Sequence, residues 1–256
     1  MNVADVLAAM ELPVGTRVDQ RVPKKLLVEK GAFTAADKRL ITDGIEEIHW
    51  LAALKPNTIG VPEYRDEVRE YLEIAVLSVT LRPGAKVERL TQLTHRAVPY
   101  PVWLVLSHDG RLTPSLVHKR WAQNEKGKVV LEGDVVEVDI GLDSDSMIIA
   151  ETEKSFMDAL TFIHQQRVHL LALYQSWMDT LQALQAARLT GVFAQTYTVE
   201  QAVVRRGALV SYDHLIRQIA VLRLQATREL QVHRLVDLNL EIKRLEVELA
   251  VVKAHL

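Results

Sequence analysis

Acidic side chains between residues 131 and 153 have the types and spacing that best suit metal chemistry in this sequence. The stretch contains eight Asp and Glu residues and no Lys or Arg. Within it, Glu137 and Asp139 lie two residues apart on a predicted strand, so their side chains should point to one face of a sheet. Together with Glu73 from a neighbouring predicted strand, they could form a carboxylate cluster that binds Mg²⁺.

A carboxylate cluster on a mixed sheet is similar to the active site of the restriction-endonuclease-like nucleases. In those enzymes an acidic residue is followed two positions later by Lys on one strand. Here Glu73 is followed by Ala75 and Glu137 by Asp139, so the lysine is missing in both places. A divergent metal-dependent nuclease is therefore an alternative hypothesis, and an acidic edge strand that resists aggregation is the simpler interpretation.

Other catalytic and metal-binding patterns are absent or incomplete in the sequence. Asp139, Asp143 and Asp145 resemble a calcium loop, but the Gly and the terminal Glu of an EF-hand are missing. None of the nine histidines lies four residues from another, so no helical pair is available for zinc. The sequence contains no phosphate-binding loop, dinucleotide-binding loop or nucleophile elbow. Apart from the nuclease alternative, we expect no catalytic residue, no metal and no cofactor.

Basic residues gather between Gly15 and Leu40, where seven Lys and Arg accompany three Asp and Glu. Pro23 is expected to keep the Arg-Val-Pro-Lys-Lys run at residues 21–25 extended, so that its side chains fan outward. A second basic pair lies at the end of a predicted strand. Such clusters either contact phosphates or form a solvated surface. The candidate nucleic-acid-binding residues are Arg21, Lys24, Lys25, Lys119 and Arg120.

The overall composition is that of a folded protein. The chain has 256 residues, 48% of them hydrophobic and 25% charged, which is enough for a substantial core. The absence of cysteine excludes disulfides, zinc ribbons and cysteine nucleophiles. The net charge of −2 gives no overall bias toward nucleic acid or membranes. Because the sequence has neither a signal-peptide pattern nor an uncharged membrane-length apolar run, we expect a cytoplasmic protein that does not contact membranes.

Residues 1–150 alternate between helical and strand-like patterns. Thr34 begins a predicted helix that continues to Pro56. The predicted strands are residues 71–82, 99–106, 112–121 and 129–140, with a helix at 86–97. Asp109-Gly110 should form a hairpin turn between the second and third of these strands. The order predicts an α+β domain over residues 1–150, in which helices flank a small mixed sheet.

Residues 151–256 contain no proline and have the strongest periodicity of the chain. Apolar residues recur at alternating intervals of four and three from Phe156 to Leu184, interrupted by Arg167, and again from Leu235 to Leu256. Gly191 supplies a stop between the two stretches. We therefore expect this second region to form a long antiparallel helical hairpin that resembles a coiled coil.

The apolar faces of this hairpin could pack within the molecule or form an interface with a second copy or another protein. Tyr174 and Trp177 favour an interface, because large amphipathic rings often anchor one. The candidate interface residues are Tyr174, Trp177, Leu238, Ile242, Leu245 and Leu249.

Three short motifs occur in order along the chain. They are Leu12-Pro-x-x-Thr16 with Arg21-Val-Pro-Lys-Lys25, then Ile48-x-Trp50-x-x-x-Leu54-x-Pro56-x-Thr58, then Ala97-Val-Pro-Tyr-Pro-Val-Trp103 with the hairpin to His118-Lys-Arg120. Together they resemble the bacterial family called domain of unknown function 4391, over roughly residues 5–250. The family has no established activity to transfer. The resemblance implies companions such as helicases and DNA methyltransferases in restriction-like or anti-phage gene clusters.

These observations lead to one functional hypothesis and two alternatives. We expect a non-enzymatic accessory subunit of a bacterial DNA-processing or anti-phage defence assembly, with a helicase or methyltransferase as partner and possible contact with DNA. The first alternative is the divergent nuclease, which would need Mg²⁺. The second is a homodimeric scaffold that associates through the C-terminal helices.

Overall fold

A computed structural model describes residues 1–32, 34–123, 125, 127–141, 147–196 and 198–256. The chain divides into two compact units, Met1–Leu181 and Gln182–Leu256. The division expected from the sequence lies near residue 150. The structure divides the chain later, because residues 151–181 still belong to the first unit. Among the described residues, no helix is both long enough and apolar enough to cross a membrane.

The first unit is a mixed sheet with helices. Its helices are α1 (Val3–Ala9), α2 (Lys24–Gly31), α3 (Ala35–Gly44), α4 (Pro56–Ile59), α5 (Val87–Ala97), α6 (Met147–Ala159) and the first part of α7 (Leu170–Thr190), with the short 3-10 helices η1 (Val14–Thr16) and η2 (Phe162–His164). Its strands are β1 (Arg17–Arg21), β2 (Ile45–Leu54), β3 (Tyr64–Arg65), β4 (Glu70–Tyr71), β5 (Ile74–Leu81), β6 (Val102–His108), β7 (Arg111–Trp121) and β8 (Val129–Glu137).

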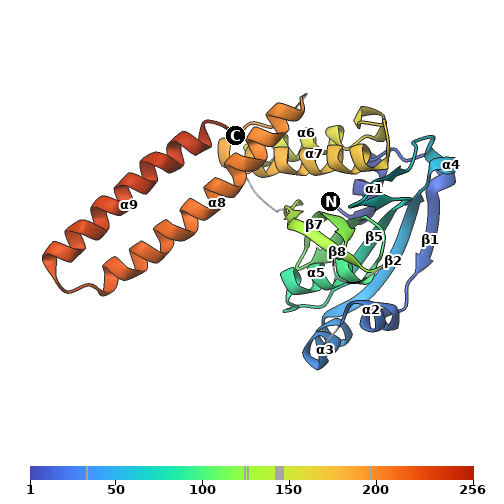
Figure 1. Ribbon diagram of the computed structural model, residues 1–256, viewed down its shortest axis with the longest axis horizontal. Helices are drawn as coiled ribbons and strands as arrows, with labels where there is room; N and C mark the ends of the chain where they lie inside the picture. Colours follow the sequence, from blue (N-terminus) through green and yellow to red (C-terminus); the bar gives the residue numbers. More distant parts are fainter. Residues whose placement is uncertain (33, 124, 126, 142–146, 197) are drawn as a thin grey trace. The chain divides into compact units, whose positions relative to one another are not determined.

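Within the described residues, six strands form one sheet in the order β1-β2-β5-β6-β7-β8 (Figure 1). The pair β5/β6 is parallel and is connected through α5, whereas the other neighbouring pairs are antiparallel. Asp109 and Gly110 join β6 to β7 with φ angles of 46° and 74°, as the hairpin turn requires. The predicted α+β fold, with its mixed sheet and flanking helices, is therefore confirmed.

Alternating apolar residues on the central strands build the core. On β5, Leu77 and Val79 point to the face that α2, α3 and α5 cover, where they pack against Leu90 and other helix residues. Gly31 lets α2 approach α5 closely, since a Cβ there would lie 2.7 Å from the Leu93 carbonyl oxygen. This core holds the sheet edges that carry the charged candidates in place.

The segment that follows α3 differs from its prediction. The sequence predicts one helix from Thr34 to Pro56, but the helix ends at Gly44 and residues 45–54 form β2. Two register irregularities lie in the pairing of β2 with β5, one of them between Ile45 and Glu47. A bulge shifts the alternation of a strand, so buried Ile45 and Ile48 lie three residues apart and imitate helical spacing.

The first long apolar repeat also differs from its prediction. Residues 156–184 do not form one helical arm, because α6 ends at Ala159 and α7 begins only at Leu170. Arg167, the residue that interrupts the repeat, lies in the loop between them. The buried side chains of this stretch as far as Leu181, including Phe156 and Leu160, belong to the first unit.

The second unit contains the predicted antiparallel helical hairpin. Its two arms are α8 (Val199–Arg228) and α9 (Val232–Lys253), which run side by side (Figure 1). The second apolar repeat forms one arm of the hairpin as expected, but its partner arm is α8 and not the first repeat, which lies in α6 and α7. The hairpin of α8 and α9 is the candidate interaction site.

Candidate interaction site on the C-terminal hairpin

Local interactions define both ends of the hairpin arms. Thr198 caps the start of α8, where its hydroxyl accepts a hydrogen bond of 3.2 Å from the Gln201 backbone N–H. Between the arms, the Glu229 carboxylate accepts a hydrogen bond of 2.8 Å from the Gln231 N–H. The short connection makes antiparallel packing of α8 and α9 the only accessible arrangement of the two arms.

A narrow apolar seam holds α8 against α9. Its buried residues are Leu215, Ile219, Ile242 and Leu245, with Leu222, Ala226, Leu249 and Val252 packed against them. The predicted interface residues Ile242, Leu245 and Leu249 therefore form the internal core of the hairpin. Leu238, the fourth predicted residue of α9, lines a hollow between the helices.

Many apolar side chains on the same helices are left exposed. They are Val203, Val204, Val210, Ile216, Val221, Leu224, Val236, Leu240, Val247 and Val251. A two-helix hairpin can bury only the side of each helix that faces the other. Where such exposed apolar side chains adjoin one another, they mark interaction sites in soluble proteins.

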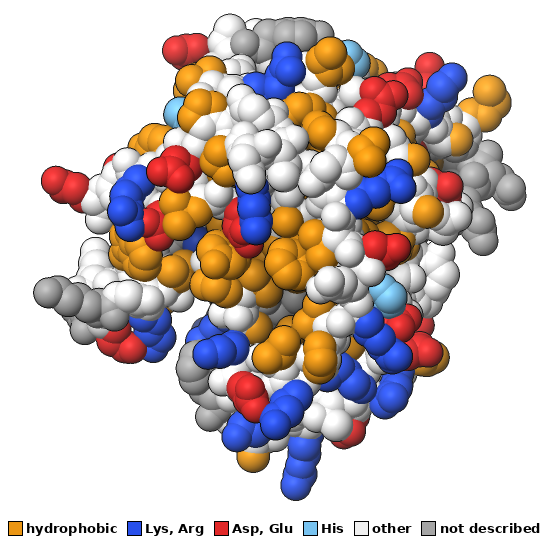
Figure 2. Space-filling view, turned by 90° about the vertical axis from the view of Figure 1, so that its right-hand side faces the viewer, with side chains coloured by type: hydrophobic (Ala, Val, Ile, Leu, Met, Phe, Trp, Pro, Cys, Tyr) orange, Lys and Arg blue, Asp and Glu red, His pale blue; other side chains and the backbone are white. Residues whose placement is uncertain are grey.

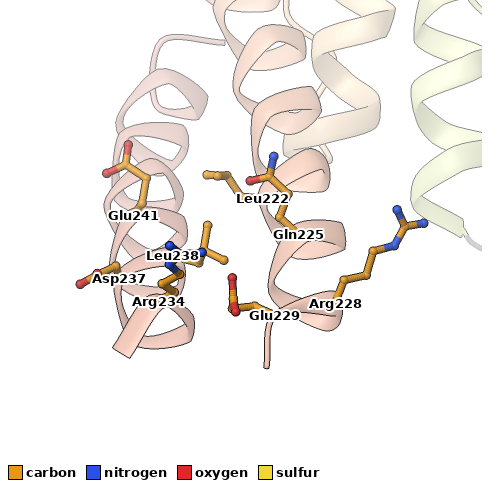
Figure 3. Close-up of a pocket in the computed structure, with 8 residues that line it drawn as sticks. All are labelled: Leu222, Gln225, Arg228, Glu229, Arg234, Asp237, Leu238 and Glu241. Atoms are coloured by element: carbon orange, nitrogen blue, oxygen red, sulfur yellow. The ribbon is translucent and has the colours of Figure 1, made fainter. Parts of the chain in front are cut away.

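Two adjoining hollows form a groove along one side of the hairpin. Their volumes are about 570 and 960 Å³, and both are lined by Leu222 and Glu241. Figure 3 shows the first hollow, where Leu222 of α8 and Leu238 of α9 point into the space between the helices. The second extends along the arms and has Leu215 and Leu245 on its floor.

Charged side chains line the rims of this groove. Of the described residues that line it, the charged ones from α8 are basic, Arg217 and Arg228, whereas α9 supplies the carboxylates of Asp237, Glu241 and Glu248 together with Arg234 and Arg244. A groove with an apolar floor and charged rims is the usual receptor for an amphipathic helix. No catalytic group is needed for such binding.

Tyr174 and Trp177 lie in the first unit and are fully buried. The Tyr174 hydroxyl shares its single proton between the carbonyls of Val102 (2.8 Å) and Val117 (3.1 Å) and accepts from the Val117 N–H at 3.0 Å. The Trp177 indole donates to the Leu160 carbonyl at 3.0 Å. These rings join α7 to β6, β7 and α6, and neither is accessible to a partner.

The basic run at residues 21–25 is extended only as far as Pro23, because α2 begins at Lys24. Lys24 donates to the carbonyls of Thr42 (3.1 Å) and Ile45 (2.8 Å) and so caps the end of α3. Arg21 is exposed and pairs with Glu47 at 3.2 Å, and Lys25 pairs with Glu29 at 3.6 Å. Basic side chains nevertheless gather over α2 and α3, at the lower end of the face shown in Figure 2.

Lys119 and Arg120 lie far from that surface. They belong to β7, which is separated from β1 by three strands, so the two basic groups do not converge. Lys119 is only 3% exposed, and its ammonium nitrogen donates to the carbonyls of Val98 (2.6 Å) and Tyr100. Burial lowers the pKa of Lys119 from 10.5 to about 7. Lys119 therefore anchors the end of α5 rather than contacting a phosphate.

The structure does not bring the three candidate carboxylates together. Glu73 precedes β5, which is separated from β8 by β6 and β7, and it pairs with Lys55 at 3.3 Å. Asp139 accepts a hydrogen bond of 2.6 Å from the Thr113 hydroxyl. Burial, with the nearby negative charges of Asp139 and Glu88, raises the pKa of Glu137.

No group of three His, Asp or Glu in the described part of the chain is placed to hold a metal ion. The calcium-like positions Asp143 and Asp145 lie outside the described residues.

A partly buried polar chain was not foreseen from the sequence. The Tyr71 hydroxyl and His118 Nδ1 share a hydrogen bond of 2.5 Å, and His118 Nε2 contacts the Gln175 amide oxygen at 2.7 Å. The Gln175 amide nitrogen in turn donates to Asp179 at 2.9 Å. Burial raises the pKa of Tyr71, so this hydroxyl stays protonated. Its members come from β4, β7 and α7, and no local spacing could have revealed their contact.

Comparison with known proteins agrees with the sequence resemblance. No curated protein and no solved structure gives a significant match. Residues 10–249, nearly the whole chain, match the family described as Domain of unknown function (DUF4391). The matched range covers most of both the sheet unit and the hairpin. The chain therefore belongs to the DUF4391 family.

Proposed function

We propose that this protein is an assembly subunit that binds an amphipathic helix of another protein in the groove between α8 and α9. The observation that carries the proposal is the groove itself, with its leucine floor and charged rims. A docked helix would bury apolar surface that the hairpin alone leaves in water. Three packed helices would also be more stable than the narrow two-helix seam.

Charge on the rims specifies the chemistry of the partner. Acidic side chains on one flank of the incoming helix would face Arg217 of α8, and basic ones would face Glu241 and Glu248 of α9. The family resemblance supports a helicase or a DNA methyltransferase of a bacterial DNA-processing or anti-phage system as the partner. The role needs no cofactor.

Affinity purification of the tagged full-length chain from its native host tests this proposal. We expect a partner at near-stoichiometric amount, and we expect Arg217→Glu on the groove rim to reduce its recovery several-fold. Lys253→Glu, at the end of α9 and outside the groove, is the matched control and should change nothing. Full recovery with Arg217→Glu, or no partner with the unmodified chain, would contradict the groove assignment.

Binding of duplex DNA to the surface of α2 and α3 is a second candidate function. The exposed bases there are Lys25, Lys30, Lys38 and Arg39, in the region where Figure 2 shows basic side chains gathered. Neutralised phosphates release counterions, so the affinity should fall steeply as salt increases.

Fluorescence anisotropy with labelled duplex DNA checks this second candidate. Lys38→Glu with Arg39→Glu should weaken binding several-fold, whereas Lys253→Glu should not. Binding that does not change with salt, or no detectable binding, would contradict the proposal that this surface binds duplex DNA. We do not extend the proposal to nuclease activity, because Glu73 lies apart from Glu137 and Asp139.

A further inference from the structure

A second apolar stripe runs along α9, away from the seam with α8. It consists of Val236, Leu240, Val247 and Val251, which are 50%, 63%, 64% and 58% exposed. At about 100° per residue, these four positions fall within roughly 60° of the helix circumference. Ile242 and Leu245 of the seam lie on nearly the opposite side of the same helix. An outward face of a solvated helix is normally charged, so this stripe requires another explanation.

Val236, Leu240 and Val247 of the stripe also belong to a repeat with the spacing of a coiled-coil seam, which Val251 adjoins. Residues 236, 240, 243, 247, 250 and 254 recur at alternating intervals of four and three, with Lys243 as the only charged member. A helix with two such seams packs on two neighbours. We infer that α9 pairs along this stripe with α9 of a second copy of this chain, in antiparallel orientation. This contact lies on a different side of α9 from the floor of the groove proposed above for another protein, and Asp237 and Arg244 border both.

Charge complementarity identifies the second copy as the occupant. When Val236 faces Val247 of the second copy, Leu240 faces Lys243, and Asp237 faces Arg244 beside the stripe. Twofold symmetry repeats each contact, which gives two Asp–Arg pairs for one interface. A shift by one heptad would instead place Arg244 opposite its own counterpart. The charges therefore select one antiparallel register.

Lys243 limits the strength of this dimer. Its aliphatic stem can cover Leu240 of the second copy while its ammonium group reaches water. A lysine at a core position of a coiled coil fixes the register at a cost in stability. A stripe of four side chains on each chain is also smaller than the interfaces of stable complexes, which bury about 1,200–2,000 Å². We therefore expect a weak dimer whose population rises with concentration.

Analytical ultracentrifugation of the full chain over a range of concentrations tests the inference. The sedimentation coefficient should rise with concentration for the unmodified chain. Leu240→Asp with Val247→Asp should keep the chain monomeric. Leu230→Asp is the matched control, because Leu230 is 95% exposed and lies in the connection outside the stripe. Lys243→Leu should tighten the dimer at least tenfold, and a dimer unaffected by all of these changes would overturn the assignment.

A charge exchange distinguishes a second copy from any other occupant. Asp237→Arg alone and Arg244→Asp alone should each weaken self-association, because each creates like-charged neighbours across the interface. The double variant restores opposite charges in both symmetric pairs and should recover the dimer. If it stays monomeric while circular dichroism shows intact helices, the antiparallel register is wrong. Arg217→Glu should leave the dimer unchanged, so failure of the groove proposal is observed separately.

Discussion

At the scale of single residues, burial gives Lys119 a role that its charge alone does not indicate. In the folded protein its pKa is about 7, below the 10.5 of an ordinary lysine. Between these values the unfolded chain binds more protons than the folded one, so stability should rise as the pH rises through this window. Below about pH 7 both states are protonated, and this contribution no longer varies.

The Lys119→Met variant tests this linkage. The free energy of unfolding of the unmodified protein should exceed that of the variant by an amount that grows with pH, at most by about 1.4 kcal/mol per unit. Urea denaturation between about pH 7 and pH 9 measures how the free energy of unfolding of each protein changes with pH. Parallel slopes would mean that Lys119 keeps its charge inside the protein. The lost hydrogen bonds to Val98 and Tyr100 lower the free energy of unfolding of the variant at every pH, so they do not affect the comparison of its pH dependence.

Tyr174 is a second residue whose role depends on position. Replacement by Phe removes the hydroxyl that joins α7 to β6 and β7 and leaves buried backbone groups of Val102 and Val117 without that partner. We expect a loss of roughly 1–3 kcal/mol in the free energy of unfolding. Tyr100→Phe is the matched control, since Tyr100 is partly exposed and should tolerate the change. Equal stability of both variants would show that the hydroxyl contributes nothing.

At the scale of elements, the seam of α9 is the clearest case in which periodicity alone is sufficient. Leu245 occupies its centre and is buried against α8. Leu245→Asp places a carboxylate there and should cost roughly 2–5 kcal/mol, which is large for a two-helix unit. Far-UV circular dichroism should show lost helicity, and exposed Leu230→Asp should not. Unchanged helicity would mean that the two arms do not depend on this seam.

β2 is the opposite case, in which periodicity misleads. Its apolar residues fit one face of a helix because a bulge changes their spacing, and only the hydrogen bonds to β1 and β5 decide for a strand. Such pairing involves residues that are distant in the chain, so a local pattern cannot contain it.

At the scale of the whole molecule, the two units should differ in local stability. The first unit has a core of sheet and helices, whereas the second depends on one narrow seam. Backbone amides of α9 should therefore exchange with deuterium much faster than those of β5 and β6. Hydrogen exchange followed by mass spectrometry measures this, at low concentration so that self-association does not add protection. Equal protection in both units would contradict the division.

The sequence by itself determined the fold class, the strands around Asp109-Gly110, a C-terminal helical hairpin with α9 as its second arm, and the seam of α9. These features depend on propensity, turn chemistry and periodicity, which act over a few residues and can be read locally. Only the tertiary structure decided that Tyr174 and Trp177 are buried, that Lys119 is buried and that Glu73 lies apart from Glu137 and Asp139. Burial and strand order depend on contacts between residues far apart in the chain. For that reason, side chains that look equally suited to binding in the sequence have different roles in the folded protein.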